Sequence, residues 1–317
     1  MEAKTYNIVV LLLTDNNAQT IDRSIQSILD QSIYSERIKV IAVDNHSTDG
    51  TYKKLLGYVK SNDISVYRLD KRYLKTRQMN HANNLMRHTM HAYMTILEPS
   101  DVLYPDYLER CTNLLDDPIK TDCRIIFSEV DLIDDEGKSF KQTPMFDEDR
   151  VLRRKKSFVE VFNKGLGHKV QCFYRAGVIP KSLFELPHFV DFTDCFRKAF
   201  FLQSHPGIYM RTSQACICKT KYPDKIVDLV SRFYLITRLK VFRDTLNDES
   251  VAFLKGLDSE DIYRNLSGLA LEYASESLAD GETGTARRIL LFAEMVFKDI
   301  VHSDFYSELK AITVHKT

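Results

Sequence analysis

The sequence has 317 residues, 44% hydrophobic and 28% charged, the composition of a globular protein that can bury a sizeable core. Lys+Arg and Asp+Glu balance at 44 each, so no overall field favours nucleic acid or an anionic membrane surface. The six cysteines lack C-x-x-C spacing, which favours reduced thiols in a cytoplasmic protein. No apolar run reaches the roughly 18 residues of a membrane span, so no transmembrane segment is expected, and peripheral attachment to the inner face of the membrane stays open.

The first hundred residues alternate apolar strands with amphipathic helices. Strands are predicted at residues 6–13, 38–43, 65–69 and 92–97, and helices at 21–31, 51–59 and 80–91, with Thr20 as a helix cap. Because this order implies right-handed crossovers, we expect an α/β fold with a mainly parallel sheet flanked by helices. The Val- and Ile-rich strand at 38–43 ends abruptly in polar residues, at the edge where open α/β sheets bind ligands.

The rest of the chain changes in character towards its end. A helix is predicted at 104–115, strands at 124–132 and 169–176, a helix at 191–200, and further helices at 227–246, 262–279 and 285–301. The cationic segment 146–165 indicates a solvated face or loop, with phosphate or acceptor binding as the alternative. We therefore expect an α/β domain at residues 1–224 and a helical region at 225–317, which folds back on that domain or mediates oligomerisation.

Several segments match one family when read in order. These are the strand that ends Leu13-Thr14-Asp15-Asn16, residues 43–51 (Val-Asp-Asn-His-Ser-Thr-Asp-Gly-Thr), and residues 97–108, which begin Leu-Glu-Pro-Ser-Asp. Together they resemble the family 2 glycosyltransferases of the GT-A type, in which the second block reads Val-Asp-Asp-Gly-Ser-Thr-Asp-Gly-Thr. The resemblance covers about residues 6–225 and implies a Rossmann-like GT-A domain that binds a nucleotide sugar and transfers the sugar with inversion.

The resemblance also implies roles for individual residues. Asp191 matches the family's catalytic base, which accepts the proton of the acceptor hydroxyl; its alternative role is that of a helix N-cap or surface carboxylate. The implied donor-binding residues are Thr14, Asn16, Asp44, Asn45, Arg77, Asn83, Glu98, Ser100 and Asp101. Lys75, Lys219 and Lys221, together with Arg77, are candidates to compensate the charge of the phosphates, although each taken singly is better explained as an exposed cation.

The chain departs from the family pattern at the metal motif. Glu98-Pro99-Ser100-Asp101 replaces a motif that usually supplies two carboxylates, the ligands that hard cations prefer. Asp101 would hold Mn²⁺ or Mg²⁺ if one binds; the alternative is that nearby cations neutralise the diphosphate. The nucleoside pocket departs as well, because Asp15, Asn45 and Ala82 stand where the family has Tyr, Asp and Arg.

The function expected from this resemblance is an inverting glycosyltransferase. It would move a sugar from a nucleotide-diphosphate donor, with a UDP-sugar favoured, to a hydroxyl of a glycan, polymer or protein. Surface polysaccharide, cell-wall or teichoic-type polymer and glycoprotein synthesis are the implied pathways, and another copy or a partner glycosyltransferase could bind the C-terminal helices. The alternative is a catalytically weak or inactive relative that acts as a binding or assembly partner. Nucleotidyl transfer is less favoured, since residues 14–18 lack a glycine-rich phosphate loop.

Overall fold

The chain forms two compact units. In the computed structural model the described residues are 7–33, 38–59, 64–73, 75–86, 91–120, 122–133, 138–141, 143–153, 157, 170–176, 205–218, 225–226, 229–230, 233, 236–237 and 259–315. One unit comprises Met1–Arg154, Lys169–His188 and Phe200–Thr220, and the other Lys155–His168, Phe189–Ala199 and Lys221–Thr317. The domain boundary expected after residue 224 stays a prediction.

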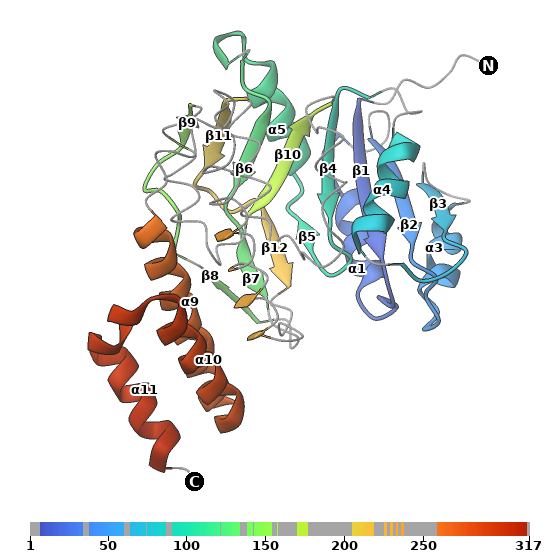
Figure 1. The fold of residues 1–317 in the computed structure, drawn as a ribbon. Helices are drawn as coiled ribbons and strands as arrows, with labels where there is room; N and C mark the ends of the chain where they lie inside the picture. The colour runs from blue at the N-terminus through green and yellow to red at the C-terminus, as the bar shows by residue number, and fades with distance from the viewer. Residues whose placement is uncertain are drawn as a thin grey trace, which may run out of the picture. The chain divides into compact units, whose positions relative to one another are not determined.

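An eight-stranded sheet forms the centre of the first unit, in the order β3-β2-β1-β4-β10-β6-β11-β9 (Figure 1). Its strands are β1 (Ile8–Thr14), β2 (Ile38–Asp44), β3 (Ile64–Arg68), β4 (Tyr93–Leu97), β6 (Ile125–Ser128), β9 (Arg150–Leu152), β10 (Gln171–Arg175) and β11 (Gly207–Met210). β1 pairs in parallel with β2 and β4, whereas β10 runs antiparallel to both β4 and β6. The predicted mainly parallel sheet is confirmed.

The register of the sheet brings several strand ends to one edge. Thr14 pairs with Asp44 at the ends of β1 and β2, and Asp44 pairs in turn with Arg68 at the end of β3. β4 ends beside them, since Leu12 of β1 pairs with Leu97. All seven residues of β1 are buried because both faces of a covered parallel strand must be apolar. We call the edge formed by these four carboxyl ends the carboxyl rim.

Four α-helices and one short 3-10 helix accompany this sheet among the described residues. They are α1 (Ile21–Leu29), α3 (Thr51–Val59), α4 (Lys75–Met86), α5 (Tyr107–Asp116) and the 3-10 helix η1 (Pro118–Lys120). The helix predicted at 80–91 was placed too late, because α4 already begins at Lys75. Thr20 occupies the N-cap position of α1, as predicted, but its side chain makes no capping hydrogen bond.

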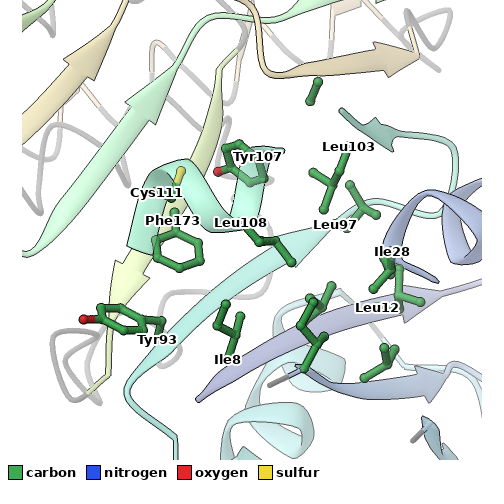
Figure 2. Packing of buried hydrophobic residues seen from close by; sticks show 14 of the residues in the cluster. Ile8, Leu12, Ile28, Tyr93, Leu97, Leu103, Tyr107, Leu108, Cys111 and Phe173 are labelled. Atoms are coloured by element: carbon green, nitrogen blue, oxygen red, sulfur yellow. The ribbon is translucent and has the colours of Figure 1, made fainter. Parts of the chain in front are cut away.

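The hydrophobic core joins the sheet to α5 (Figure 2). Ile8 of β1, Tyr107 and Cys111 of α5, and Phe173 of β10 are all fully buried. The ring of Phe173 stacks on Tyr93 at 5.5 Å between centroids and meets Tyr107 edge-on at 6.2 Å. Cys111 is a free thiol, and burial raises its pKa, so it serves as a small apolar residue there.

A smaller, four-stranded sheet has the order β5-β12-β7-β8. Its strands are β5 (Val102–Leu103), β7 (Asp131–Ile133), β8 (Ser139–Lys141) and β12 (Ala215–Cys218). The single strand predicted at 124–132 is therefore two strands, β6 and β7, which belong to different sheets. In the cationic segment, predicted as a loop or solvated face, Arg150–Leu152 forms β9 at the edge of the large sheet.

The described part of the second unit is helical. It contains α9 (Ser259–Ala279), α10 (Thr283–Val296), a 3-10 helix η4 (Lys298–His302) and α11 (Asp304–His315), of which the sequence analysis missed α11. Ser267 Oγ of α9 donates to the Ala293 carbonyl of α10 at 2.9 Å. On α10, Leu291 and Met295 remain exposed, at 66% and 64%. In the described segments, no helix is both long and apolar enough to span a membrane.

Two predicted helical segments are not covered by this description. The helix predicted at 191–200 lies outside the described residues, and so does most of the one at 227–246.

The helix predicted at 51–59 buries a narrower apolar face than the sequence indicated. In α3, Leu55 is buried, whereas Leu56 and Val59 are 44% and 40% exposed.

Candidate functional site

Asp44 is the central carboxylate of the carboxyl rim and is fully buried. Thr14 Oγ1 donates to Asp44 Oδ1 at 3.1 Å, and the Ser47 N–H donates to Asp44 Oδ2 at 3.0 Å. Arg68 Nε lies 3.5 Å from Asp44 Oδ2. A buried carboxylate needs such donors, so Asp44 binds together the ends of β1, β2 and β3.

Asn45 joins the rim to the loop that follows β3. Its Nδ2 donates to the Tyr73 carbonyl at 2.7 Å and to Asp15 Oδ2 at 3.0 Å, while its Oδ1 accepts from the Tyr73 N–H at 2.8 Å. Arg72 Nε also donates to Asp15 Oδ2, at 3.0 Å. A carboxylate at position 45 would have no N–H to donate, so the amide is what allows this arrangement.

Two residues of the rim adopt the left-handed backbone region, Asn16 with φ 55° and His46 with φ 58°. The Asn16 N–H donates to Ser47 Oγ at 2.9 Å, and Asn16 Oδ1 accepts from the Thr48 N–H at 2.9 Å. His46 Nδ1 lies 3.1 Å from the Leu69 carbonyl oxygen, to which it donates when it carries the proton. The loops after β1 and β2 are thus fastened to each other.

Asp49 fixes the start of α3 to the loop after β1, a role that the sequence analysis missed. Its Oδ2 accepts from the Ala18 N–H at 2.9 Å, and its Oδ1 accepts from the N–H and hydroxyl of Thr51. Burial acts to raise the pKa of Asp49, but the hydrogen bonds from Thr51 and Ala18 prevail and lower it. The Asp-Gly-Thr sequence at the helix start was the available signal.

Gln78 is a second residue that sequence reasoning missed. It lies on α4 and is 3% exposed, and its Nε2 donates to the carbonyls of Thr14 at 3.0 Å and Val43 at 2.8 Å. These carbonyls belong to residues at the carboxyl ends of β1 and β2, so one amide connects α4 to both strands at the rim.

The ring of Tyr73, at the edge of the rim, makes cation–π contacts with two side chains. The Arg77 guanidinium lies 4.3 Å and the Lys71 ammonium 5.5 Å from the centroid of its ring, and its hydroxyl donates to Asp70 at 2.8 Å. Arg77 is exposed, as a residue that contacts phosphate must be before its ligand arrives. This places a predicted donor-binding cation beside the loop that Asn45 holds.

The segment that follows β4 carries the motif Glu98-Pro99-Ser100-Asp101, which differs from the family's metal-binding motif. The Asp101 N–H donates to the Glu98 carbonyl at 2.9 Å, and Asp101 is 4% exposed. Among the described residues, no three His, Cys, Asp or Glu side chains gather as a possible metal site. With Ser100 in place of a carboxylate, the described donor set does not fit a divalent cation, which prefers several oxygen ligands.

The predicted site residues therefore fall into three groups. Hydrogen bonds link Thr14 directly to Asp44 and Asn45, and Ser47 joins Asn16 to Asp44. Arg77 and the segment 98–101 lie at neighbouring positions of the rim. Lys75 and Asn83 lie on α4, but their side chains are outside the description. Asp191, Lys219 and Lys221 lie outside the described residues altogether.

Comparison with known proteins agrees with this geometry. The family model of glycosyl transferase family 2 matches residues 9–183, more than half of the chain, so the chain belongs to this family and is a glycosyltransferase. No curated protein matches the sequence. The comparison with solved structures, however, finds relatives by fold.

Two examples from different organisms illustrate the match, and each covers almost the whole chain. One is residues 1–349 of S. aureus TarS in complex with UDP-GlcNAc, with TM-score 0.61 and 11% identity over 98% of this chain and 88% of that chain. The other is the mannosyltransferase PcManGT from Pyrobaculum calidifontis in complex with GDP-Man and Mn²⁺, with TM-score 0.53 and 14% identity over 98% and 84%. The likeness confirms the GT-A fold that the sequence predicted.

Proposed function

We propose that this glycosyltransferase moves a sugar from a nucleotide-diphosphate donor to an acceptor hydroxyl, with inversion at the anomeric carbon. The supporting observation is the convergence of Thr14, Asp44, Asn45 and the segment 98–101 on one rim of a family 2 chain. Ligands of open α/β sheets bind at such rims. We favour a UDP-sugar donor, in line with the UDP and UDP-GlcNAc bound to structures of similar fold.

The proposed reaction is a single displacement. The acceptor oxygen forms a bond to the anomeric carbon while the bond from that carbon to the diphosphate oxygen breaks and its electrons stay on the diphosphate. The acceptor proton passes to Asp191, the proposed base. The acceptor is proposed to be a hydroxyl of a glycan, surface polymer or protein on the cytoplasmic side of the membrane.

The departing diphosphate gathers negative charge, which cationic side chains stabilise at close range. We assign this task to Arg77, with Lys75, Lys219 and Lys221 as further candidates. Arg77 is the best supported of these, since it is exposed at the rim and held against the ring of Tyr73. Because the described residues do not fit a metal, the proposal includes no metal-dependent step.

A thermal-shift panel tests donor binding. UDP and GDP are added to the whole chain, each with EDTA and with Mn²⁺. A ligand at about 100 times its dissociation constant stabilises the folded state by roughly 2.7 kcal/mol. We expect UDP to raise the melting temperature in EDTA as well as in Mn²⁺. Flat responses to both nucleotides would contradict the proposal and favour the binding or assembly role.

Replacement of Asp191 tests the base. We expect Asp191→Asn to abolish UDP release from UDP-sugars in the presence of acceptors while the UDP thermal shift stays intact, because the amide binds no proton from the acceptor. Asp280→Asn, which changes an acidic residue at the turn between α9 and α10, is the control and should retain full turnover. Undiminished turnover in Asp191→Asn would remove Asp191 from the mechanism.

A further inference from the structure

One side of α1 forms a polar seam with the segment that follows β4. Arg23 Nη2 donates to the Ser100 carbonyl at 2.8 Å, and Ser24 Oγ donates to the Asp101 carbonyl at 2.7 Å. One turn later, Ser27 Oγ accepts from the Leu103 N–H at 3.2 Å. Gln31, just beyond the helix, donates to the Tyr104 carbonyl at 2.7 Å. The spacing of these residues puts them on one face of the helix.

This seam takes the place of a neighbouring strand. β5 pairs with β12 alone among the described strands, so the backbone just before β5 needs other partners. Figure 1 shows α1 beside β5, and the side chains of α1 supply those partners. The path of residues 100–104 is therefore set by a helix that lies more than 70 positions earlier in the chain.

Ser24 makes the contact that matters most for the rim. Its side chain is fully buried, and its hydroxyl donates to the carbonyl of Asp101. The N–H of Asp101 is held in turn by the Glu98 carbonyl at 2.9 Å. Because both backbone groups of Asp101 are held, the direction of its Cα–Cβ bond is fixed, and with it the region that the carboxylate can reach.

We propose that Ser24 is a positioning residue that orients Asp101 in the donor-binding segment 98–101. This inference rests on the proposed function, because the proposed function supplies the nucleotide-sugar donor that Asp101 would contact. Ser24 touches no reacting atom; it acts through the Asp101 peptide. Fixed supporting groups of this kind matter because displacements of an ångström in a binding site weaken its contacts severely.

The test measures the affinity for UDP, or for GDP if GDP is the diphosphate that binds, by calorimetry in EDTA and in Mn²⁺. Ser24→Ala should raise the dissociation constant about tenfold, which corresponds to 1.4 kcal/mol. Ser27→Ala is the matched control, a buried serine one turn along the same helix whose hydroxyl bonds the Ser24 carbonyl and the Leu103 N–H but neither backbone group of Asp101. It should lower the melting temperature by a similar amount and leave the dissociation constant unchanged.

A double-mutant cycle separates positioning from stability. If Ser24 acts through the Asp101 carboxylate, adding Ser24→Ala to Asp101→Asn should not weaken nucleotide binding beyond the effect of Asp101→Asn alone. Additive losses would overturn the inference. Should Ser24→Ala fail to fold, Ser24→Cys serves in its place, since the thiol fills the site of the hydroxyl but donates a weaker hydrogen bond.

The outcomes distinguish failure of the inference about Ser24 from failure of the proposed function on which it rests. If the unaltered chain binds neither UDP nor GDP, the proposed function falls and the inference falls with it. If the unaltered chain binds one of them and Ser24→Ala binds it equally well, the inference alone is overturned.

Discussion

At the scale of single residues, side-chain amides at the carboxyl rim make the hydrogen bonds to the backbone that a neighbouring strand makes elsewhere in a sheet. Asn45 pairs with both the N–H and the carbonyl of Tyr73, as a neighbouring strand would. Gln78 donates to two strand carbonyls at once. Both amides are buried, so their hydrogen bonds are worth more than those of exposed groups, and the loss of either amide removes hydrogen bonds from backbone groups of the rim.

Replacement of Gln78 tests this view. Gln78→Ala should lower the free energy of unfolding by about 1–3 kcal/mol, because it removes two buried hydrogen bonds, to the carbonyls of Thr14 and Val43. The measurement is urea denaturation followed by circular dichroism. Gln26→Ala is the control: the Gln26 amide is exposed and donates to Asp30, so the expected change stays within about 0.5 kcal/mol. Equal effects of the two replacements would contradict the role of Gln78.

Some residues of the carboxyl rim could be predicted from the sequence, and others could not. Thr14, Asp44 and Asn45 could be found because they stand in short motifs directly after apolar strands. Gln78 could not, since its partners lie 64 and 35 positions away and its helix carries no pattern that indicates them. The exchange of Asp for Asn at position 45 was visible, but its reason, the two donors to Tyr73 and Asp15, needed the fold.

At the scale of elements, a charged contact joins α1 to α3. Lys54 Nζ lies 2.5 Å from Asp22 Oδ2, and the Tyr58 hydroxyl donates to Asp22 Oδ1 at 3.0 Å. The hydrogen bond from Lys54 is the largest cause that lowers the pKa of Asp22 below its usual value. A lowered pKa in the folded state means that the contact stabilises the fold above the unfolded pKa and is lost as pH falls through the folded one.

The pH dependence of this contact can be measured with Asp22→Asn. At about pH 7 the unaltered chain should be more stable than the variant, by less than about 1 kcal/mol because the pair is nearly half exposed. The difference should begin to shrink as the pH falls below about 4, the ordinary carboxyl pKa, and should be lost as the pH falls through the lowered pKa of Asp22 in the folded state. Urea titrations across that range provide the values. Lys54→Gln should reproduce the trend, and a difference that does not change with pH would refute the assignment.

Element boundaries were harder to predict than element types. The strand predicted at 124–132 has the right composition, but the chain leaves the large sheet at Glu129, a buried residue that is 2% exposed. Glu129 accepts hydrogen bonds from the Tyr209 hydroxyl and from the Met145 N–H. These partners lie 80 and 16 positions away, so the break between β6 and β7 depends on contacts that local pattern does not contain.

At the scale of the whole molecule, the parallel half of the large sheet could be predicted and the other half could not. β1 to β4 follow from the alternation of strands and helices, which permits few topologies. The reversed β10 between β4 and β6, and the position of β11 beside β6, depend on pairing between segments far apart in the chain. Glycosyltransferase family membership followed from motifs alone, because the rim motifs lie within the predictable half.

Hydrogen exchange with UDP tests where the donor acts in the molecule. We expect protection in the rim loops, residues 15–20, 45–50, 69–73 and 98–101, because a bound ligand suppresses their local opening. Residues 259–315, which form α9 to α11, should exchange at an unchanged rate and serve as the internal reference. Mass spectrometry of peptides with and without UDP provides the comparison. Protection confined to α9 to α11 would place the nucleotide away from the rim.

The left-handed backbone at Asn16 and His46 constrains how this chain can be diversified. Few side chains accept φ values near 55°, and β-branched residues are strongly disfavoured there. Position 46, glycine in the family pattern, has already taken one of the few tolerated alternatives, and its imidazole reaches Leu69. Mutant libraries aimed at a new sugar nucleotide should hold these two positions to Gly, Asn, Asp or His and place their variety at Asp15, Thr48 and Arg72.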